Sequence, residues 1–434
     1  MPLTAEPRTR WQYCNLMYAT VGEIVQRLAG DKLENVLREW FWEPLGMQST
    51  TFSVDEAQAN KDQNGDSKLA TGYFWDSERE EFVPEAITDL SGLPGAGATI
   101  SSVHDYVPWM QAHLAAHASS DTANNTSPIT NRLYRAVTLP RSITQPLEPL
   151  AAADTPLYGL GWVEMSLGSV HLITHGGSVT GFGTQVYLLP EEGVGFVTMG
   201  NTMVTSNMLG AALFAVVLNR GRGEVTLQER QDVEQRLRNQ VEHAGYGPVS
   251  PFRKVGSSMA NTRSEPWAPL PGASSDYAGL YLHPAYGAFN VSIAGISSSS
   301  NENESPSQKP LGSPSALAAN SLLVQPSLRT WPFQFLLNHD SSSLFNNSIY
   351  WLHGENVSHP DCGVDAVSGS LRLKCKDGVV PELNDRGRAV FEYDQEGAVS
   401  RLGMELESEL VRQAFEDGGE ENWKAGMIWF ERLV

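Results

Sequence analysis

The sequence YCNLMYATVGEIVQRLAGDKLENVLREWFWEPLGMQSTTF, residues 13–52, decides the fold of the first half of this chain. After Tyr13-Cys14-Asn15, apolar residues recur at helical spacing and Gly30 ends the run, because glycine readily adopts the left-handed conformation of a helix C-cap. A second amphipathic helix is predicted from Asp31, as its N-cap, to the residue before Glu43. The stretch therefore predicts two consecutive helices, each with one apolar stripe.

Three further segments carry specific patterns. Glu43 to Phe52 reads E-P-L-G-M-x-x-T-x-F, Pro94 to Gly97 is a Gly-rich turn before a predicted helix, and His175-Gly176-Gly177 follows a strand-like apolar run. Together with Tyr13-Cys14-Asn15, these segments resemble the signatures and flanking sequences of the serine β-lactamase and penicillin-binding protein family. The resemblance is to class C β-lactamase-related esterases and D-aminopeptidases, and it covers roughly the first half of the chain.

The resemblance implies an α/β (α+β) fold, with a β-lactamase/transpeptidase-like domain in which helices flank an antiparallel sheet. Residues 1–220 are assigned to this domain. The strands expected to form its sheet are at residues 158–166, 170–174, 184–189 and 194–200. An apolar helix over residues 201–218 is expected to pack on the sheet.

The third signature of the family, S-x-x-K, is absent. In the family it lies upstream of Tyr-x-Asn, where this chain has only twelve residues, none of them Ser, and no S-x-x-K occurs further along. That signature carries the nucleophilic Ser and its neighbouring Lys. The resemblance therefore implies an acyl-transfer enzyme whose nucleophile is missing from these residues, by truncation or by loss.

Tyr13 and Asn15 take catalytic roles from the resemblance. In the family, the Tyr lies beside the Ser and Lys and carries the proton to the leaving group, while the Asn orients the substrate amide or the Lys. A free Tyr has a pKa of about 10, so Tyr13 needs a nearby cation to act at neutral pH, and the Lys that would supply it is absent. The alternative is that Tyr13 only caps a helix start and packs its ring.

His175-Gly176-Gly177 takes the place of the family's K-T-G, on the strand that borders the active site. The resemblance gives His175 a catalytic role and Gly176 and Gly177 substrate contacts, with the N–H of Ser178 as one oxyanion donor. His in place of Lys is typical of the esterase, D-aminopeptidase and carboxypeptidase branches. The alternative is a plain strand histidine followed by a glycine turn.

Two other kinds of site are discounted. His113 and His117 share one helical face, but they lack the general-base Glu of an H-E-x-x-H zinc site and a clear third ligand, so no metal is expected. The H-G-G run is also typical of the oxyanion loop of α/β-hydrolase lipases, which require a G-x-S-x-G elbow, and the chain contains none. No cofactor is expected.

Charge and composition exclude some partner classes. The net charge is −20, which disfavours nucleic acid and anionic membranes because phosphates demand a basic face. No apolar run approaches the roughly 18 to 20 residues of a membrane helix. We expect a small-molecule or peptide substrate, no nucleic acid and no membrane partner. The oligomeric state cannot be read from the sequence.

The second half of the chain has a different pattern. Residues 221–274 are assigned to a helix and a Pro/Ser/Gly-rich linker, and residues 275–434 to a β-rich domain, either a small barrel or a sandwich. Its Tyr277-Ala278-Gly279-Leu280-Tyr281 resembles the Y-x-G-x-Y opening of the lipocalin-like domain often fused to this family. The predicted strands are at residues 279–282, 289–292, 348–352, 388–393 and 427–430. Residues 297–317 are expected to be a disordered insertion.

The three cysteines and the N-terminus bear on the compartment. Cys362 and Cys375 lie close together in a strand-and-turn region where they are able to pair, and Cys14 would remain free. The N-terminus lacks the basic and apolar regions of a signal peptide, whereas N-x-S/T sequons keep secretion of the parent protein open. The compartment is therefore left undetermined.

The residues and the resemblance predict a β-lactamase-related serine hydrolase. It would form an acyl-enzyme on ester, amide or D-amino-acid peptide substrates and then hydrolyse or transfer the acyl group. As this chain alone it would be inactive, because the nucleophile is missing. The alternative is a non-catalytic binding protein that retains the substrate cleft.

Overall fold

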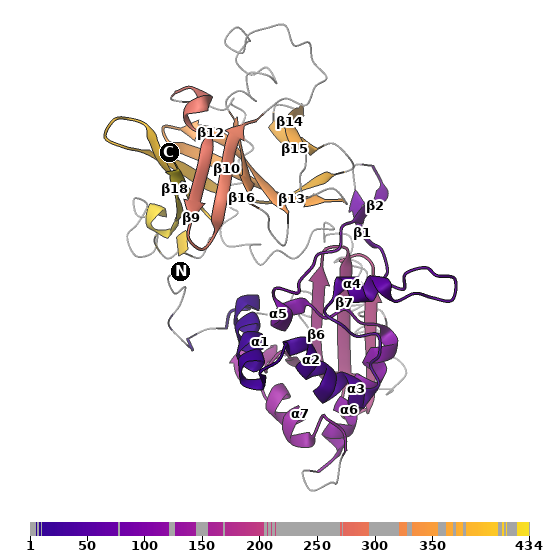
Figure 1. Ribbon diagram of the computed structural model, residues 1–434. Helices are drawn as coiled ribbons and strands as arrows, with labels where there is room; N and C mark the ends of the chain where they lie inside the picture. The colour runs from indigo at the N-terminus through magenta and orange to yellow at the C-terminus, as the bar shows by residue number, and fades with distance from the viewer. Residues whose placement is uncertain are drawn as a thin grey trace, which may run out of the picture. The chain divides into compact units, whose positions relative to one another are not determined.

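The chain forms two compact units, one within Ala5–Pro248 and one within Val249–Val434, each with its own hydrophobic clusters. They are seen in a computed structural model (Figure 1). The structure describes residues 6, 8–9, 11–76, 79–120, 126–144, 155–167, 170–203, 206, 210, 213, 270, 272–294, 321–327, 332–354, 362–367, 370–375, 379–406, 410–411, 414 and 423–433.

Helices of the first unit lie across one face of its sheet, so that α2, α3 and α5 are in front of strands β6 and β7 in Figure 1. Buried apolar side chains from the helices and from the sheet pack together on this face. The helices are α1 (Asn15–Ala29), α2 (Leu33–Leu37), α3 (Glu43–Leu45), α4 (Val54–Ala59), α5 (Pro94–Gly97), α6 (Val103–Ala118) and α7 (Asn131–Thr138), with a π-helical turn η1 (Arg38–Trp42) between α2 and α3.

Helix α1 begins directly after Tyr13-Cys14 and ends at Gly30, which adopts φ 73° as its C-cap. The first predicted helix and its glycine stop are therefore confirmed. On its packed side, Gly22 approaches Gly95 of α5 closely, and a Cβ on Gly22 would lie 3.1 Å from the Cα of Gly95. The Gly-rich turn therefore lets α5 contact the backbone of α1.

The second helix differs from the prediction at both ends. Its N-cap is Lys32, and Asp31 instead accepts hydrogen bonds from the backbone N–H of Lys32 and the side chain of Asn35. The helix does not stop before Glu43 but continues through η1 into α3 and ends at Gly46, which has φ 73°. Pro44 is the second residue of α3 and directly follows the π-helical turn η1.

The sheet of the first unit has six antiparallel strands in the order β3-β4-β5-β6-β7-β8. They are β3 (Ser142–Ile143), β4 (Leu157–Tyr158), β5 (Val163–Leu167), β6 (Val170–Val179), β7 (Phe182–Leu189) and β8 (Val194–Gly200); a separate hairpin pairs β1 (Gly72–Asp76) with β2 (Glu81–Glu85). The run predicted as one strand over residues 158–166 is two strands, since Gly161 turns the chain with φ 80°. β6 is longer than predicted and contains His175-Gly176-Gly177-Ser178.

The helix expected over residues 201–218 lies mostly outside the described residues, although Ser206, Gly210 and Leu213 are helical. The expected linker up to residue 269 and the insertion at residues 297–317 also lie outside them. Within the part of the chain that the structure describes, no helix is long and apolar enough to cross a membrane.

The second unit is a closed antiparallel barrel, and its strands follow the chain in the order β9-β10-β11-β12-β13-β16-β17-β18 before β18 pairs with β9. The strands are β9 (Gly279–His283), β10 (Gly287–Ile293), β11 (Ser321–Pro326), β12 (Phe333–Ser341), β13 (Leu344–His353), β16 (Val380–Tyr393), β17 (Val399–Met404) and β18 (Ile428–Leu433); short 3-10 turns cover η2 (Ser274–Asp276) and η4 (Trp423–Gly426). Of the predicted barrel or sandwich, the barrel is the form observed.

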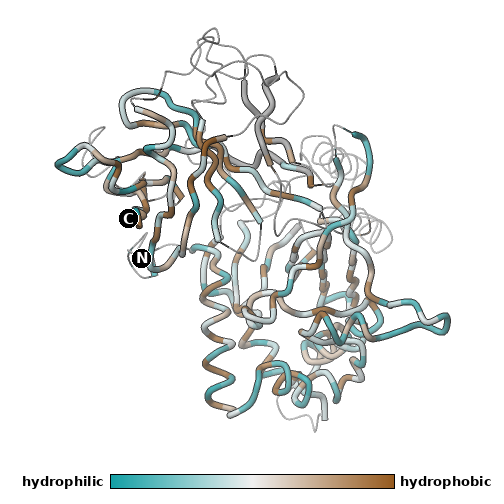
Figure 2. The backbone as a smooth tube through the Cα atoms, turned by 45° about the horizontal axis from the view of Figure 1, so that its top comes forward, coloured by the Kyte–Doolittle hydropathy of each residue, from teal (hydrophilic) through white to brown (hydrophobic). Residues whose placement is uncertain are grey.

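Aromatic side chains fill the barrel core. Buried rings include Phe289, Phe335 and Phe430, and the rings of Phe289 and Phe430 stack at 4.2 Å between centroids. Figure 2 shows hydrophobic residues along the strands and hydrophilic residues toward hairpin ends. Strands β11, β12 and β17 were not predicted, because long runs of β11 and β12 are buried without the polar-apolar alternation that marks a half-exposed strand.

A hairpin of β14 (Cys362–Val367) and β15 (Ser370–Cys375) is inserted between β13 and β16. Cys362 and Cys375 form its first cross-strand pair and are joined by a disulfide. Both cysteines pack against the cluster that contains Leu352 and Val379. Cys14 is a free, exposed cysteine.

The contact between α1 and α5 yields a prediction about stability. A Cβ at Gly95 would overlap the carbonyl oxygen of Tyr18 in the backbone of α1. We expect Gly95→Ala to lower the free energy of unfolding of the first unit by about 2 kcal/mol, the usual cost of overpacking. Urea unfolding followed by tryptophan fluorescence measures this. Gly97→Ala is the matched control, since its Cβ would meet only Leu90 at an ordinary 3.6 Å; equal losses in the two variants would contradict the close approach.

Candidate functional site

The structure brings together two predicted site residues that are far apart in the sequence. Tyr13 lies just before α1 and His175 lies in β6, and their ring centroids are 6.2 Å apart. Alternation along β6 puts His175 on the same face as Ile173, which packs against the helices. The tripeptide and the strand therefore meet on the helix-covered face of the sheet.

Both ring nitrogens of His175 are engaged. Nδ1 lies 2.7 Å from the carbonyl oxygen of Gly176, and Nε2 lies 2.9 Å from the hydroxyl of Tyr158. A carbonyl only accepts, so Nδ1 carries the hydrogen and Nε2 accepts the Tyr158 O–H. Burial lowers the pKa of His175, although the bond to Gly176 opposes that shift. The imidazole is therefore held neutral, in one tautomer.

Tyr18 of α1 extends this hydrogen-bond chain. Its hydroxyl is hydrogen-bonded to the hydroxyl of Tyr158 and to the backbone N–H of Gly161. The Gly161 N–H donates to the Tyr18 hydroxyl, and the Tyr158 hydroxyl is hydrogen-bonded to both Tyr18 and Nε2 of His175. These hydrogen bonds connect α1 with β6 through the turn between β4 and β5.

The tyrosine hydroxyls at the site are protonated. Burial raises the pKa of Tyr13, and the neighbouring Tyr18 raises it further. Burial also raises the pKa of Tyr158, with additional contributions from Tyr18 and Tyr13. None of these groups is poised as a phenolate at neutral pH, because no cation of the described site stabilises the charged form.

The strand edge beside His175 is uncovered within the described residues. β5 pairs with β6 only as far as Val163 opposite Thr174, whereas β6 continues to Val179. A two-residue loop joins Val179 of β6 to Phe182 of β7, so the backbone N–H and C=O of Val179 both bond to Phe182. The backbone groups of the neighbouring residue in β6 therefore point away from β7. By this alternation the N–H of Ser178 points to the uncovered edge.

The two glycines on this edge are exposed and differ in their surroundings. A Cβ at Gly176 would overlap the side-chain oxygen of Gln185, whose Nε2 donates to Thr174. A Cβ at Gly177 would only approach Thr184 Oγ1 at 3.3 Å. A Cβ at residue 176 would therefore have to displace the flexible end of Gln185, whereas one at residue 177 would need only a small adjustment of Thr184. The Ser178 hydroxyl donates to the Met203 carbonyl at 3.1 Å.

Asn15, unlike Tyr13, has no described side-chain contact with the strand residues of the site. It is the first residue of α1 and is exposed, and no described contact joins its side chain to His175. Cys14, between them, is the N-cap residue but makes no side-chain cap. The structure thus joins Tyr13, and not Asn15, directly to the strand residues.

Tyr158 and Tyr18 were not predicted from the sequence, whereas Trp11 was expected to be a core or pocket-wall residue. Trp11 packs on both Tyr158 and Tyr13, with ring centroids 5.3 and 6.3 Å apart. The only signal for Tyr158 was the pair of glycines that follows it, Gly159 and Gly161. A turn of that kind indicates a sharp change of direction but does not reveal which strand the tyrosine faces.

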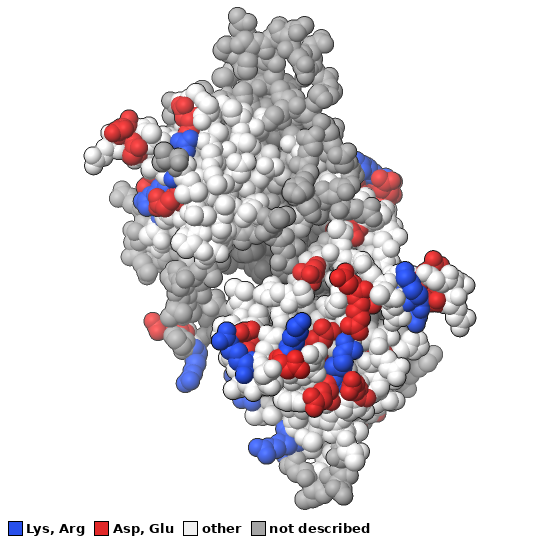
Figure 3. Space-filling view, viewed as in Figure 1, with Lys and Arg blue, Asp and Glu red and all other residues white. Residues whose placement is uncertain are grey.

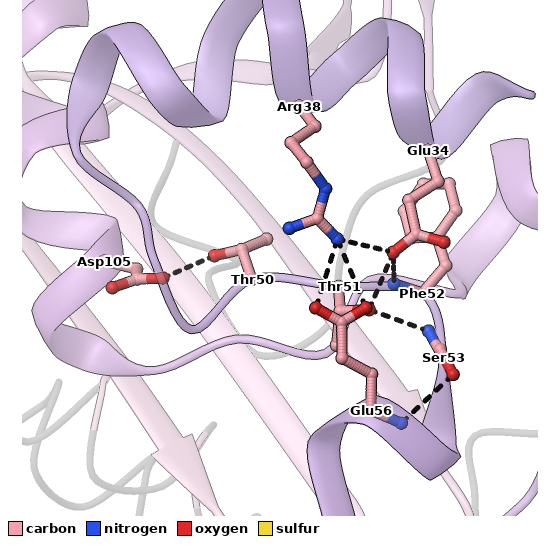
Figure 4. A network of polar contacts seen from close by, with 8 residues as sticks. All are labelled: Glu34, Arg38, Thr50, Thr51, Phe52, Ser53, Glu56 and Asp105. Atoms are coloured by element: carbon pink, nitrogen blue, oxygen red, sulfur yellow. Dashed lines mark hydrogen bonds and ion pairs between the residues drawn. The ribbon is translucent and has the colours of Figure 1, made fainter. Parts of the chain in front are cut away.

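A second polar network lies in the segment that contributed to the resemblance (Figure 4). Glu34 accepts hydrogen bonds from the Thr51 hydroxyl, the Phe52 N–H and Arg38, at 2.7, 2.8 and 3.1 Å. Burial raises the pKa of Glu34, but these partners outweigh it and hold the pKa below its usual value. The network also includes Glu56, and it fastens α2 to the loop after α3.

Asp105 anchors the other end of this loop. It accepts hydrogen bonds from the Ser49 N–H and the Thr50 hydroxyl, at 2.8 and 2.7 Å. Figure 3 shows acidic and basic side chains intermixed on the visible face of the first unit, in keeping with such local pairing. These contacts stabilise the fold and share no residue with the Tyr13 and His175 site.

His113, considered as a metal ligand from the sequence, is buried among aromatic rings. It packs on Trp109 and Trp162, at 4.3 and 5.4 Å between centroids. Burial lowers the pKa of His113 to about 4, so it is a neutral ring of the core. In the described parts of the chain, no group of three or more His, Cys, Asp or Glu could hold a metal ion.

Comparison with known proteins connects this geometry to a family. The beta-lactamase family model matches residues 1–218. An unguisins hydrolase of Aspergillus campestris is 30% identical over 295 residues, 66% of this chain and 50% of that protein. A D-aminopeptidase of Cereibacter sphaeroides is 23% identical over 214 residues, 49% of this chain and 36% of that protein. This chain thus spans about half or less of these curated relatives.

Among solved structures, a penicillin-binding protein homologue from Pyrococcus abyssi is 15% identical, covering 92% of this chain and 64% of its own, with a TM-score of 0.44. The assignment rests on the family model, whose match includes both Tyr13 and His175. Because that match covers half of the sequence, this chain belongs to the β-lactamase family.

Proposed function

We propose that this chain carries the tyrosine and histidine part of the active site of a β-lactamase-related serine hydrolase. Its substrates would be esters, amides or D-amino-acid peptides. The observation that carries the proposal is the 6.2 Å approach of the Tyr13 and His175 rings beside the uncovered edge of β6. The family's reaction needs these groups in one place, next to backbone donors.

The proposed reaction has two steps. The oxygen of a Ser bonds to the substrate carbonyl carbon, the bond to the leaving group breaks, and the Ser proton passes through Tyr13 to that leaving group. Water, or another acceptor, then attacks the acyl-enzyme and releases the Ser. The substrate would lie along the edge of β6, where Gly177 presents no side chain and the N–H of Ser178 donates to the developing oxyanion.

His175 is proposed to position the site rather than to exchange protons with the substrate. Its Nδ1–H donates to the Gly176 carbonyl, and its Nε2 accepts from the Tyr158 hydroxyl. The ring therefore packs beside Tyr13 and orients the carbonyl of Gly176 on the strand. This replaces the direct catalytic role that the sequence alone suggested for His175.

The substrate class is proposed from the chemistry and from the relatives. Relatives are named D-aminopeptidase and unguisins hydrolase, and both names describe hydrolases. His175 stands where β-lactamases that hydrolyse antibiotics have Lys. Both points favour amide or ester substrates other than β-lactams.

The barrel is proposed to be a lipocalin-like domain. Its eight strands follow the chain around the barrel, which is the up-and-down order of lipocalins. Its interior is occupied by buried rings, among them Phe289, Phe345 and Phe391. A packed interior favours contact with a partner or with the rest of the enzyme over ligand storage.

The alternative is a non-catalytic binding protein that keeps the substrate cleft. It is favoured by the absence of S-x-x-K from the sequence and by the protonated state of Tyr13. It requires that no other polypeptide supply the Ser and Lys. A catalytic assay of this chain with and without such a polypeptide separates the two functions.

Residues 1–434 alone are expected to show no acyl transfer. Mixed with p-nitrophenyl acetate they should give no burst, and a fluorophosphonate probe should leave the mass unchanged, because the nucleophile and its Lys are absent. The Cereibacter sphaeroides D-aminopeptidase, assayed alongside, is the positive control. A stoichiometric mass increase located at a Ser of this chain would overturn the proposed site.

Tyr158→Phe is expected to raise the pKa of His175. The Tyr158 O–H donates to Nε2 and thereby stabilises the neutral ring, so its removal makes protonation easier. An NMR titration of the His175 ring proton measures this, and in the unchanged protein the ring should titrate below 6.5. Tyr187→Phe is the control, since Tyr187 stacks on Phe196. An unchanged or lower pKa of His175 in Tyr158→Phe would show that the Tyr158 hydrogen bond does not stabilise the neutral ring.

A further inference from the structure

Three leucines on the outer surface of the barrel take no part in its core. Leu280 and Leu282 of β9 and Leu433 of β18 are 40%, 41% and 48% exposed. Leu433 is the cross-strand partner of Leu280, and Leu282 lies two residues further along β9, on the same face. Their side chains therefore form one apolar patch on the outside of the barrel.

Strand β10 places an asparagine beside this patch. Asn290 is exposed, whereas its neighbours in the chain, Phe289 and Val291, are buried in the barrel core. Because side chains alternate along a strand, Asn290 points outward. Its cross-strand partner in β9 is Leu280, and directly opposed residues on one face have Cβ atoms about 5 Å apart. Asn290, Leu280 and Leu433 therefore lie in one row across β10, β9 and β18.

The residues that follow Asn290 make it a modification signal. Asn290-Val291-Ser292 is an N-x-S sequon, in which a hydroxyl residue two positions on marks the asparagine as an acceptor for an N-linked glycan. One other sequon, Asn346-Asn347-Ser348, has its asparagine among the described residues, and Asn346 is half-buried. Within the described structure, Asn290 is therefore the sequon asparagine that is exposed to solvent.

The same domain contains a disulfide, which bears on the compartment. Cys362 and Cys375 are joined across the β14–β15 hairpin. Disulfides form and persist in oxidising surroundings such as the lumen of the endoplasmic reticulum, and sequons are glycosylated in proteins that pass through that compartment. The disulfide and the exposed sequon therefore indicate the same surroundings.

The size of the patch bears on what covers it. Three leucine side chains, each less than half exposed, offer far less than the roughly 800 Å² that each partner buries in a stable protein interface. A group attached to Asn290 needs no such area, because its covalent bond holds it beside Leu280. The patch therefore suits an attached glycan better than a docked protein.

We propose that Asn290 carries an N-linked glycan whose first sugars cover the patch of Leu280, Leu282 and Leu433. The donor is an oligosaccharide linked to a lipid diphosphate. Nδ2 of Asn290 bonds to the anomeric carbon of the oligosaccharide, the bond from that carbon to the phosphate oxygen breaks, the lipid diphosphate leaves, and Nδ2 loses one proton. The C–H faces of the sugar rings then lie against the leucines while the sugar hydroxyls remain in water.

Glycopeptide analysis of the full chain, secreted from eukaryotic host cells behind a cleavable leader, tests the site. Release of the glycans by peptide N-glycosidase in ¹⁸O water converts each glycosylated Asn to a labelled Asp. The protease Glu-C cuts after Glu302 and so separates Asn290 from the sequon at Asn303. We expect the label at residue 290 in the unchanged protein and in Ser292→Thr, which keeps the sequon, and its loss in Ser292→Ala. An unlabelled Asn290 in the unchanged protein would overturn the proposal.

Binding of the dye bis-ANS to exposed apolar surface tests whether the glycan covers the leucines. Ser292→Ala should bind more dye than Ser292→Thr, and Leu280→Lys added to Ser292→Ala should remove the excess. Asn346→Gln is the matched control and should leave dye binding unchanged, since Asn346 pairs with Asn338 and Arg388 rather than with a leucine of the patch. Circular dichroism checks that each variant keeps its fold. Equal dye binding by the two Ser292 variants, or an excess that Leu280→Lys does not remove, would contradict the covering of the patch.

Discussion

The candidate site depends on one hydrogen bond, from the Tyr158 O–H to Nε2 of His175, 2.9 Å long. It joins strand β4 to strand β6, and Tyr18 connects it to helix α1. The Gly176 carbonyl, which accepts from Nδ1–H, fixes the tautomer in which Nε2 accepts the Tyr158 O–H. Because both ring nitrogens are then hydrogen-bonded, proton transfer beside this histidine is left to Tyr13 and to groups that pack next to it.

The turn from Gly159 to Trp162 serves two purposes in the same sheet. It delays the start of β5 until Val163, which leaves the end of β6 without a neighbour on that side in the described structure. It also places Tyr158 against His175 and the Gly161 N–H against Tyr18. The open strand edge and the held histidine are therefore products of one local change in chain direction, which Gly161 permits at φ 80°.

Local patterns predicted much of this architecture. Helix α1 and its stop at Gly30 follow from periodicity, and the meeting of Tyr13 with His175 follows from the family resemblance. Tyr158 could not be found in this way, since its bond to a residue 17 positions away depends on strand register. The continuation past Pro44 was missed because a proline suits both a helix stop and the first turn of a new helix. Strand β11 was missed because residues 321–324 are all buried and show no alternation.

The most direct measurement is the tautomer of His175, read from the ¹⁵N shifts and two-bond couplings of its ring at neutral pH. We expect a neutral ring with hydrogen on Nδ1 and an acceptor Nε2, and we expect Tyr158→Phe to weaken this preference. A ring with hydrogen on Nε2, or a charged imidazolium at neutral pH, would contradict the account. Either result would favour a direct role for His175 in proton exchange with the substrate.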